Sequence, residues 1–322
     1  MKKILLGVIL GALLSYLSMR GIQFDSVAAT IRRIQPLHVF SSLLLMFLMQ
    51  VIRAVRWGLI LRPVVRVDPF TLFSVTNVGF LAIVAFPARL GELVRPLLIS
   101  RKKAVPMTSA LGTVFVERIM DLVTVLLIVA FLLPLIPLPP WLIRSLAIMS
   151  LTSLGATVFL VSMTLRRKNL EGLWGFLPAS LRGTFTGKLG RLAAQFMDGF
   201  AVIRNAGQMV RLMILSLGVW FANAGAIYAL FLAFGYSLSL LTAFILMFVL
   251  IVGIAIPTAP GFVGNWHYAC VLALTSFGLD KTDALAFAVF YHALSIGLVL
   301  ILGLLFLPFN RFTLRELRNG RA

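Results

Sequence analysis

Long apolar runs separated by short polar connections dominate the chain. A membrane-spanning helix needs about 20 mostly apolar residues, because the hydrocarbon layer of a bilayer is about 30 Å thick. Runs close to or above that length lie at 4–19, 38–61, 107–135, 141–165, 210–235 and 283–308. The pattern predicts an all-α integral membrane fold in which each of these runs spans the bilayer.

Two further apolar runs are interrupted. The run 69–86 ends at a proline and continues as a short charged helix over roughly 90–101, and the run 238–256 ends in PTAPGFVGNWH before continuing to about 277. A break inside a bilayer is tolerated only where protein or a wet cavity surrounds the freed backbone groups. We therefore expect about six to eight spanning helices plus two broken, re-entrant helix pairs. The residues at the breaks are Pro87, Gly91, Pro260, Gly261 and Gly264.

The order of these elements repeats along the chain. Placing 107–123 over 281–297 aligns a threonine, an alanine and a leucine with identical residues, and a similar shift superimposes the proline and glycine of the two breaks. Each half has three spans and one broken pair, so the second half is inverted relative to the first. Inverted repeats with matching breaks are typical of transporters, whose site lies at the repeat interface. We predict one polytopic domain over 1–322, with repeats at about 4–135 and 141–308.

Two segments have an apolar face and a polar face at helical spacing. The apolar face of 25–34 holds Val27, and that of 185–203 holds Phe196 and Phe200. Amphipathic helices of this kind lie in the plane of the membrane interface. The second segment belongs to a predicted cytoplasmic stretch, 166–208.

Composition and charge agree with a membrane protein. The chain is 61% hydrophobic, against about 45–50% apolar residues in a soluble domain. The net charge of +19 comes from basic residues at the ends of apolar runs, which indicates membrane orientation rather than nucleic-acid binding. We predict a multi-pass cell-membrane protein with both termini in the cytoplasm. The lone Cys270 excludes an internal disulfide, and the three scattered histidines predict no metal site and no cofactor.

Three charged residues cluster at the first break, namely Arg89, Glu92 and Arg95. A helix that restarts there aims free N–H groups and the positive end of its dipole at the cavity. With two arginines, this arrangement suits an anionic head group such as phosphate. The alternative is a packing kink whose arginines snorkel to the interface. Arg53 and Arg56 are likewise either snorkelling side chains or first contacts for an incoming head group.

A second charged trio, Glu117, Arg118 and Asp121, lies inside an apolar run. Each charge inside a span costs about 2.5–3.5 kcal/mol on insertion scales and normally faces a partner or a cavity. Glu117 and Asp121 share one helical face. They can pair with Arg89 or Arg95, take up a proton, or bind a cationic part of a substrate. The alternative is an ion-pair clamp between spans that touches no substrate.

The matching positions of the second half carry histidine and tyrosine in place of fixed charge. A histidine beside a membrane cavity can titrate near neutral pH. The alternative is a hydrogen-bonded packing residue. We predict a gating or charge-relay role for six residues: Glu117, Arg118, Asp121, His267, Tyr291 and His292.

Two stretches resemble the signatures of a known family. FPARLGELVRPLLISRKK, followed by SALGTVFVERIMDLV, resembles the first signature of the lysylphosphatidylglycerol synthase transmembrane-region family. APGFVGNWH, followed by DALAFAVFYHALSIGL, resembles its second signature. The resemblance covers roughly 4–308 and implies a flippase-like membrane domain. By position it carries over the family's motif residues Arg89, Glu92, Arg95, Glu117, Arg118, Asp121, Pro260, Gly261 and Gly264.

The resemblance also implies limits. In bifunctional members a separate soluble domain attaches the amino acid, and relatives with the membrane domain alone are associated with other lipids, including polyprenyl-linked sugars and hopanoids. This chain carries no soluble synthase domain, so lysyl transfer is not expected. Relatives usually carry glutamate where His267 stands and arginine where His292 stands. We therefore expect a weaker or pH-dependent link at the second broken helix pair, whose mouth we expect on the outer side of the membrane.

The function we predict from the sequence is lipid translocation. An anionic, phosphate-bearing lipid or lipid-linked precursor would cross between leaflets through a polar cavity between the repeats. One alternative is a non-transporting membrane partner of a cytoplasmic glycosyltransferase or lipid synthase. Another is a membrane-embedded lipid-modifying enzyme, although the sequence has no nucleophile elbow, metal-ligand spacing or nucleotide motif to support it.

Overall fold

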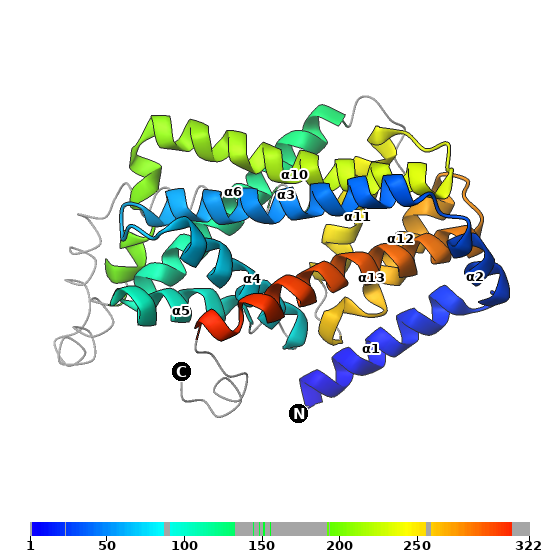
Figure 1. Cartoon of the computed structure of the whole chain (residues 1–322), viewed down its shortest axis with the longest axis horizontal. Coiled ribbons are helices and arrows are strands. Elements are labelled where there is room, and N and C mark those ends of the chain that lie inside the picture. The colour runs from blue at the N-terminus through cyan, green and yellow to red at the C-terminus, as the bar shows by residue number, and fades with distance from the viewer. Residues whose placement is uncertain are drawn as a thin grey trace. The chain divides into compact units, whose positions relative to one another are not determined.

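The computed structural model describes residues 2–22, 24–86, 91–132, 194–255 and 259–310, with single helical positions at 144, 148, 151, 155 and 192. Every regular element in these ranges is a helix (Figure 1). The helices are α1 (Lys2–Met19), α2 (Phe24–Arg32), α3 (Pro36–Leu61), α4 (Pro69–Ala85), α5 (Val94–Lys103), α6 (Met107–Leu132), α10 (Ala206–Phe234), α11 (Leu240–Ala255), α12 (Asn265–Ser276) and α13 (Lys281–Phe306).

These boundaries confirm the apolar runs predicted from the sequence wherever the structure describes them. Three described helices, α3, α10 and α13, are long and apolar enough to cross a membrane. α6 is as long as α3, at 26 residues, but it carries the charged trio in its middle. The run 141–165 and most of the segment 166–208 lie outside the described residues.

The four helices that flank the two breaks are too short to cross a bilayer alone. α4 has 17 residues and α5 has 10, while α11 has 16 and α12 has 12. At 1.5 Å per residue, the longest of them extends only about 25 Å, against a hydrocarbon layer of about 30 Å. The break between α11 and α12 contains a short 3-10 turn, Pro260–Phe262, with Gly261 and Gly264 at positive φ. The first break includes residues 87–90, which lie outside the described residues.

Contacts within the chain divide it into two compact units. The first unit consists of Met1–Ile52, Phe73–Arg95 and Gly218–Ala322. The second consists of Arg53–Leu72 and Pro96–Leu217. α3, α4, α5 and α10 each contribute residues to both units, so each unit is described below by itself.

In the first unit, α12 packs against α11, α13 and α1. Gly264 makes the closest approach, because a Cβ atom there would collide with the carbonyl oxygen of Gly11 on α1. α2 packs on α13, where the Thr30 hydroxyl donates a hydrogen bond to Asp283 over 3.1 Å. The Lys281 ammonium at the start of α13 donates to the carbonyl oxygens of Leu17 and Arg20, at 3.3 and 2.7 Å. These bonds occupy carbonyl groups at the end of α1, which lack partners inside the helix.

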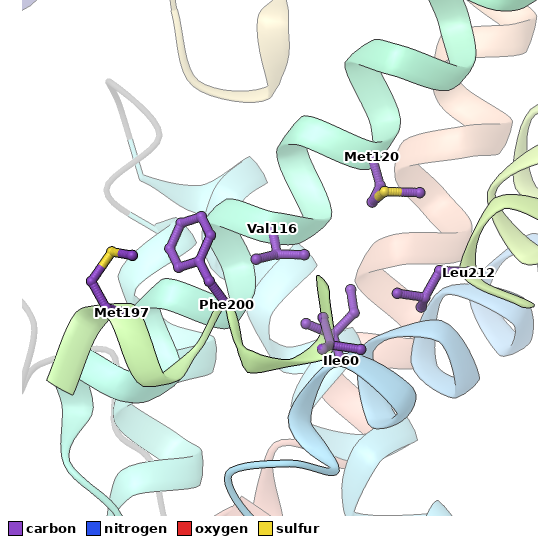
Figure 2. Close-up of a cluster of buried hydrophobic side chains, with 7 residues drawn as sticks. Ile60, Val116, Met120, Met197, Phe200 and Leu212 are labelled. Atoms are coloured by element: carbon purple, nitrogen blue, oxygen red, sulfur yellow. The ribbon is translucent and has the colours of Figure 1, made fainter. Parts of the chain in front are cut away.

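In the second unit, a buried apolar cluster joins α3, α6, α10 and the segment before α10 (Figure 2). Phe196 and Phe200 of that segment face this cluster, and the Phe196 ring lies 5.4 Å from the Phe115 ring of α6. The apolar face predicted for 185–203 therefore packs on protein at its C-terminal end. The buried members of the cluster are Ile60, Val116, Met120, Met197, Phe200, Val202 and Leu212.

The start of α4 supplies a first testable prediction. The Asp68 carboxylate accepts a 2.8 Å hydrogen bond from the backbone N–H of Thr71 and lies 3.7 Å from the Lys103 ammonium. The Thr71 bond, with help from Lys103, holds the pKa of Asp68 below its ordinary value. Because this pKa is lowered, the ionised Asp68 carboxylate stabilises the folded protein fully at neutral pH, and this stabilisation is lost as the pH falls below about 4. We expect Asp68→Ala to cost about 1 kcal/mol at pH 7, and the difference in stability from the native protein to narrow as the pH falls below about 4.

The control for this measurement is Asp68→Asn, which keeps the cap and removes the charge. An exposed ion pair contributes little, so Asp68→Asn should melt within about 1 °C of the native protein at pH 7. An unchanged gap between native protein and Asp68→Ala across this pH range would show that the carboxylate does not cap α4.

Candidate functional site

The charged trio of α6 meets a buried arginine of α3. The Arg56 guanidinium lies 2.6 Å from Asp121 and 3.1 Å from Glu117, and it also donates to the Ser216 hydroxyl of α10 over 2.9 Å. The Arg56 side chain is 0% exposed and that of Glu117 is 1% exposed. We refer to Arg56, Glu117, Asp121 and Ser216 as the ion cluster. It links three helices through charge-assisted hydrogen bonds, which are stronger than neutral ones.

Apolar and neutral buried side chains flank the ion cluster on the same helices. Ile60 lies four residues after Arg56, and Leu212 lies four residues before Ser216, so both occupy the adjacent turn of their helix. Both side chains are fully buried in the apolar cluster of Figure 2. Trp57 follows Arg56 in α3 and is also buried, and its indole N–H donates a hydrogen bond to the Thr113 hydroxyl of α6 over 3.1 Å. Excluding water strengthens the attraction between the charges and raises the cost of removing any one of them.

Two further arginines border the ion cluster. Arg53 lies three residues before Arg56 on α3, and its charge is attracted by Asp121 and Glu117 and repelled by Arg56 and Arg118. Arg118 lies 3.5 Å from Asp121 and is 36% exposed. These five residues carry three positive and two negative charges, which leaves one net positive charge.

Three of the residues predicted at the first break are described by the structure, namely Gly91, Glu92 and Arg95, and all three belong to the first unit. Gly91 packs directly on the backbone of α4, where a Cβ atom would collide with Ala82. Arg95 is 1% exposed, and its guanidinium carbon lies 5.9 Å from the centre of the Phe80 ring, within the range of a cation–π contact. Gly79 makes room for it, since a Cβ atom there would overlap the arginine stem. Pro87 and Arg89 lie outside the described residues, and Glu92 lies in a short 3-10 turn just before α5.

The second break brings its predicted residues together. His267, in the first turn of α12, contacts His292 of α13 with ring centres 4.7 Å apart. His292 Nε2 lies 2.8 Å from the carbonyl oxygen of Gly261. Tyr291 bonds Asn223 of α10 over 3.4 Å and packs against Trp266. Histidine, tyrosine and tryptophan rings thus connect the turn between α11 and α12 to α13.

Of the two alternatives for Arg56, the structure excludes a side chain that snorkels to the interface. It buries Arg56 completely as the partner of both carboxylates. The sequence analysis named Arg89 and Arg95, and not Arg56, as possible partners of Glu117 and Asp121. The cost of a charge inside the membrane was the signal that could have identified this partner. Two buried carboxylates on α6 require a nearby cation, and Arg56 lies on α3 in the same unit. No pattern in the sequence indicated Ser216.

Comparison with known proteins decides the family. Residues 4–303 match the family described as the lysylphosphatidylglycerol synthase TM region. The chain belongs to this family. A relative, the UPF0104 membrane protein MJ1078 of Methanocaldococcus jannaschii, is 26% identical over 229 residues, which is 70% of this chain and 92% of the relative. Together with its long apolar helices, this membership makes the chain a multi-pass membrane protein and confirms the resemblance seen in its two signatures.

Proposed function

We propose that this member of the lysylphosphatidylglycerol synthase transmembrane-region family translocates an anionic, phosphate-bearing lipid between membrane leaflets. The observation that carries the proposal is the ion cluster, whose charges lie inside apolar helices. Ionisable groups inside a membrane are costly and mark substrate or ion pathways by default. The net positive charge of the cluster and its neighbours suits an anionic head group.

The two broken helix pairs support a transport path. α4, α5, α11 and α12 are each shorter than the bilayer, as re-entrant helices are. Their interrupted ends expose backbone dipoles that bind ions or head groups in transporters. We propose that both pairs re-enter the membrane, with both termini of the chain in the cytoplasm, as the distribution of lysine and arginine favours.

Corresponding contacts support an inverted repeat. Tyr291 of α13 stands 174 positions after Glu117 of α6 (291 − 117). Glu117 reaches α3 through Arg56, and Tyr291 reaches α10 through Asn223. The third span of each half therefore contacts the second span from corresponding positions, through Glu117 in one half and Tyr291 in the other. We propose that this contact is the shared bridge of the two repeats.

A leaflet-exchange assay in proteoliposomes tests the proposal. Labelled anionic and zwitterionic lipids are compared for the native protein, Arg89→Ala and Glu117→Gln. We expect both variants to lose at least about 90% of anionic-lipid exchange. Arg89→Ala would remove a positive charge that binds the head group, and Glu117→Gln would remove the intramembrane charge proposed to gate the path. The matched controls are Arg66→Ala and Asp25→Asn, which change exposed charges outside these sites and should retain exchange.

Folding is checked by size-exclusion chromatography of each variant. Folded Arg89→Ala and Glu117→Gln proteins with native exchange rates would reject the head-group assignment. Absence of exchange by the folded native protein for every lipid would favour a membrane partner of a cytoplasmic lipid-modifying enzyme. A covalent change in the added lipid, detected by mass spectrometry, would favour an enzyme.

A further inference from the structure

The second break contains a pair of titratable side chains away from the ion cluster. His267 and His292 are 7% and 9% exposed, and their rings meet edge to face at 4.7 Å. They join the helix that follows the break to a third helix, since His267 lies in the first turn of α12 and His292 lies within α13. The pair therefore holds the start of α12 against a long helix.

Hydrogen bonds fix the protonation state of each ring in the closed arrangement. A carbonyl oxygen only accepts, so His292 Nε2 must carry a proton to bond Gly261 at 2.8 Å. His267 Nδ1 faces the backbone N–H of Gly264 at 3.5 Å, so this nitrogen must present its lone pair. A proton added to His267 Nδ1 would face that N–H and the positive end of the α12 dipole. Closed packing therefore requires an unprotonated His267 Nδ1.

The described surroundings of the pair supply no carboxylate to stabilise an imidazolium. The ionisable group that acts on His267 is His292 itself. Among the helices that pack against α12, α11 carries no titratable side chain. The remaining titratable residues of these elements are Lys2, Lys3 and Tyr16 on α1, Tyr268 and Cys270 on α12, and Lys281, Asp283 and Tyr291 on α13. Asp283 and Lys281 lie at the start of α13 and bond α2 and the end of α1 instead.

We propose that His267 and His292 form a proton-binding site that opens the second break and couples the proposed lipid transport to protons. The closed state has an unprotonated His267, and a proton entering at Nδ1 releases the first turn of α12 from Gly264. The ligand of this site is the proton itself. The coupling rests on the proposed function, whereas the proton-driven opening does not.

The direction of the pH effect follows from proton counting. The open state exposes the imidazoles to water and binds more protons than the closed state. The closed state is therefore favoured at high pH and loses its advantage as the pH falls below about 6.5, where a solvated histidine titrates. Each further pH unit raises the open fraction about tenfold for one linked proton.

The only cysteine in the chain provides the reporter. Cys270 lies three residues after His267 on α12 and is 0% exposed. Its thiol reacts only when α12 separates from its neighbours. The purified full-length protein in lipid nanodiscs is treated with dipyridyl disulfide, which reacts with thiols at acidic as well as neutral pH. The labelling rate is followed from pH 8 to pH 5, and each value is divided by the rate for detergent-unfolded protein at the same pH.

The expected result is a normalised rate about fivefold higher at pH 5.5 than at pH 6.5 in the native protein, because the linked proton is already half bound in the open state at pH 6.5. His267→Gln should abolish this rise, because glutamine accepts a hydrogen bond without titrating. His38→Gln removes the third histidine of the chain, which lies in α3, and should keep the native response. A flat native profile, or the same rise in His267→Gln, would overturn the proton site. Fast labelling of His267→Gln at every pH would assign the pair a packing role alone and would also overturn it.

Lipid exchange separates this inference from the proposed function. Native exchange should accelerate when a proton gradient acidifies the side of the membrane that faces the second break, and His267→Gln should lose this acceleration. A native Cys270 response without any lipid exchange would leave the proton site standing and reject the translocator. Exchange that ignores the gradient while Cys270 responds would reject the coupling alone.

Discussion

Replacing Arg56 by leucine is expected to lower the free energy of unfolding by about 3–5 kcal/mol, the usual cost of removing one partner from a buried ion pair. Glu117 would keep a buried negative charge beside Asp121 without the guanidinium that bonds both. The measurement is thermal unfolding in detergent, followed by the loss of monodisperse protein. Arg62→Leu is the matched control, because Arg62 is exposed one residue beyond the end of α3, and it should change stability by less than about 0.5 kcal/mol.

A triple variant distinguishes charge balance from lost packing. Arg56→Leu combined with Glu117→Gln and Asp121→Asn removes all three charges, and apolar or neutral replacements of a buried ion cluster are often tolerated. We expect this variant to regain at least half of the lost stability. Failure to recover would show that the Arg56 stem and its bond to Ser216 matter more than charge. A stable triple variant that exchanges lipid normally would make the ion cluster a structural clamp.

Substituting Gly264 by alanine is expected to destabilise the second break more than the same change elsewhere. Gly264 has a φ of 96°, and its Cβ atom would collide with the Gly11 carbonyl oxygen on α1. Backbone strain of this kind costs about 1–3 kcal/mol, and overpacking adds about 1–3 kcal/mol. Gly278 has a φ of 84° with open space around it. Gly278→Ala therefore reports the strain alone, and subtracting its effect isolates the contact with α1.

The readout is the melting temperature of both variants and the labelling rate of Cys270, which lies on α12 beyond the break. We expect Gly264→Ala to speed labelling at neutral pH and Gly278→Ala to leave it unchanged. Equal melting temperatures for the two variants would mean that α1 does not hold the second break closed.

Most of the helical framework could be predicted from hydropathy, because membrane helices must be long and apolar and breaks require proline or glycine. The breaks at Pro260 and Gly264 illustrate this, since their residue types alone forced the interruption. The partner of Glu117 could not be predicted. An arginine near the end of a span can snorkel or turn inward, and only packing against α6 and α10 decides between them. His267 and His292 were placed in one group by their motif, but their bonds to Gly264 and Gly261 depend on the geometry of the turn.

The contacts of α2 and α1 with α13 also set an order of biogenesis. Thr30 bonds Asp283 and Lys281 bonds Leu17, pairs that are 253 and 264 residues apart in the chain. At about 5–20 residues per second, a ribosome needs roughly 13–50 s to deliver those partners after the N-terminal helices emerge. During that interval the first helices wait in the membrane without their final neighbours. α1 and α2 are thus made well before α13 and form these contacts only after its synthesis.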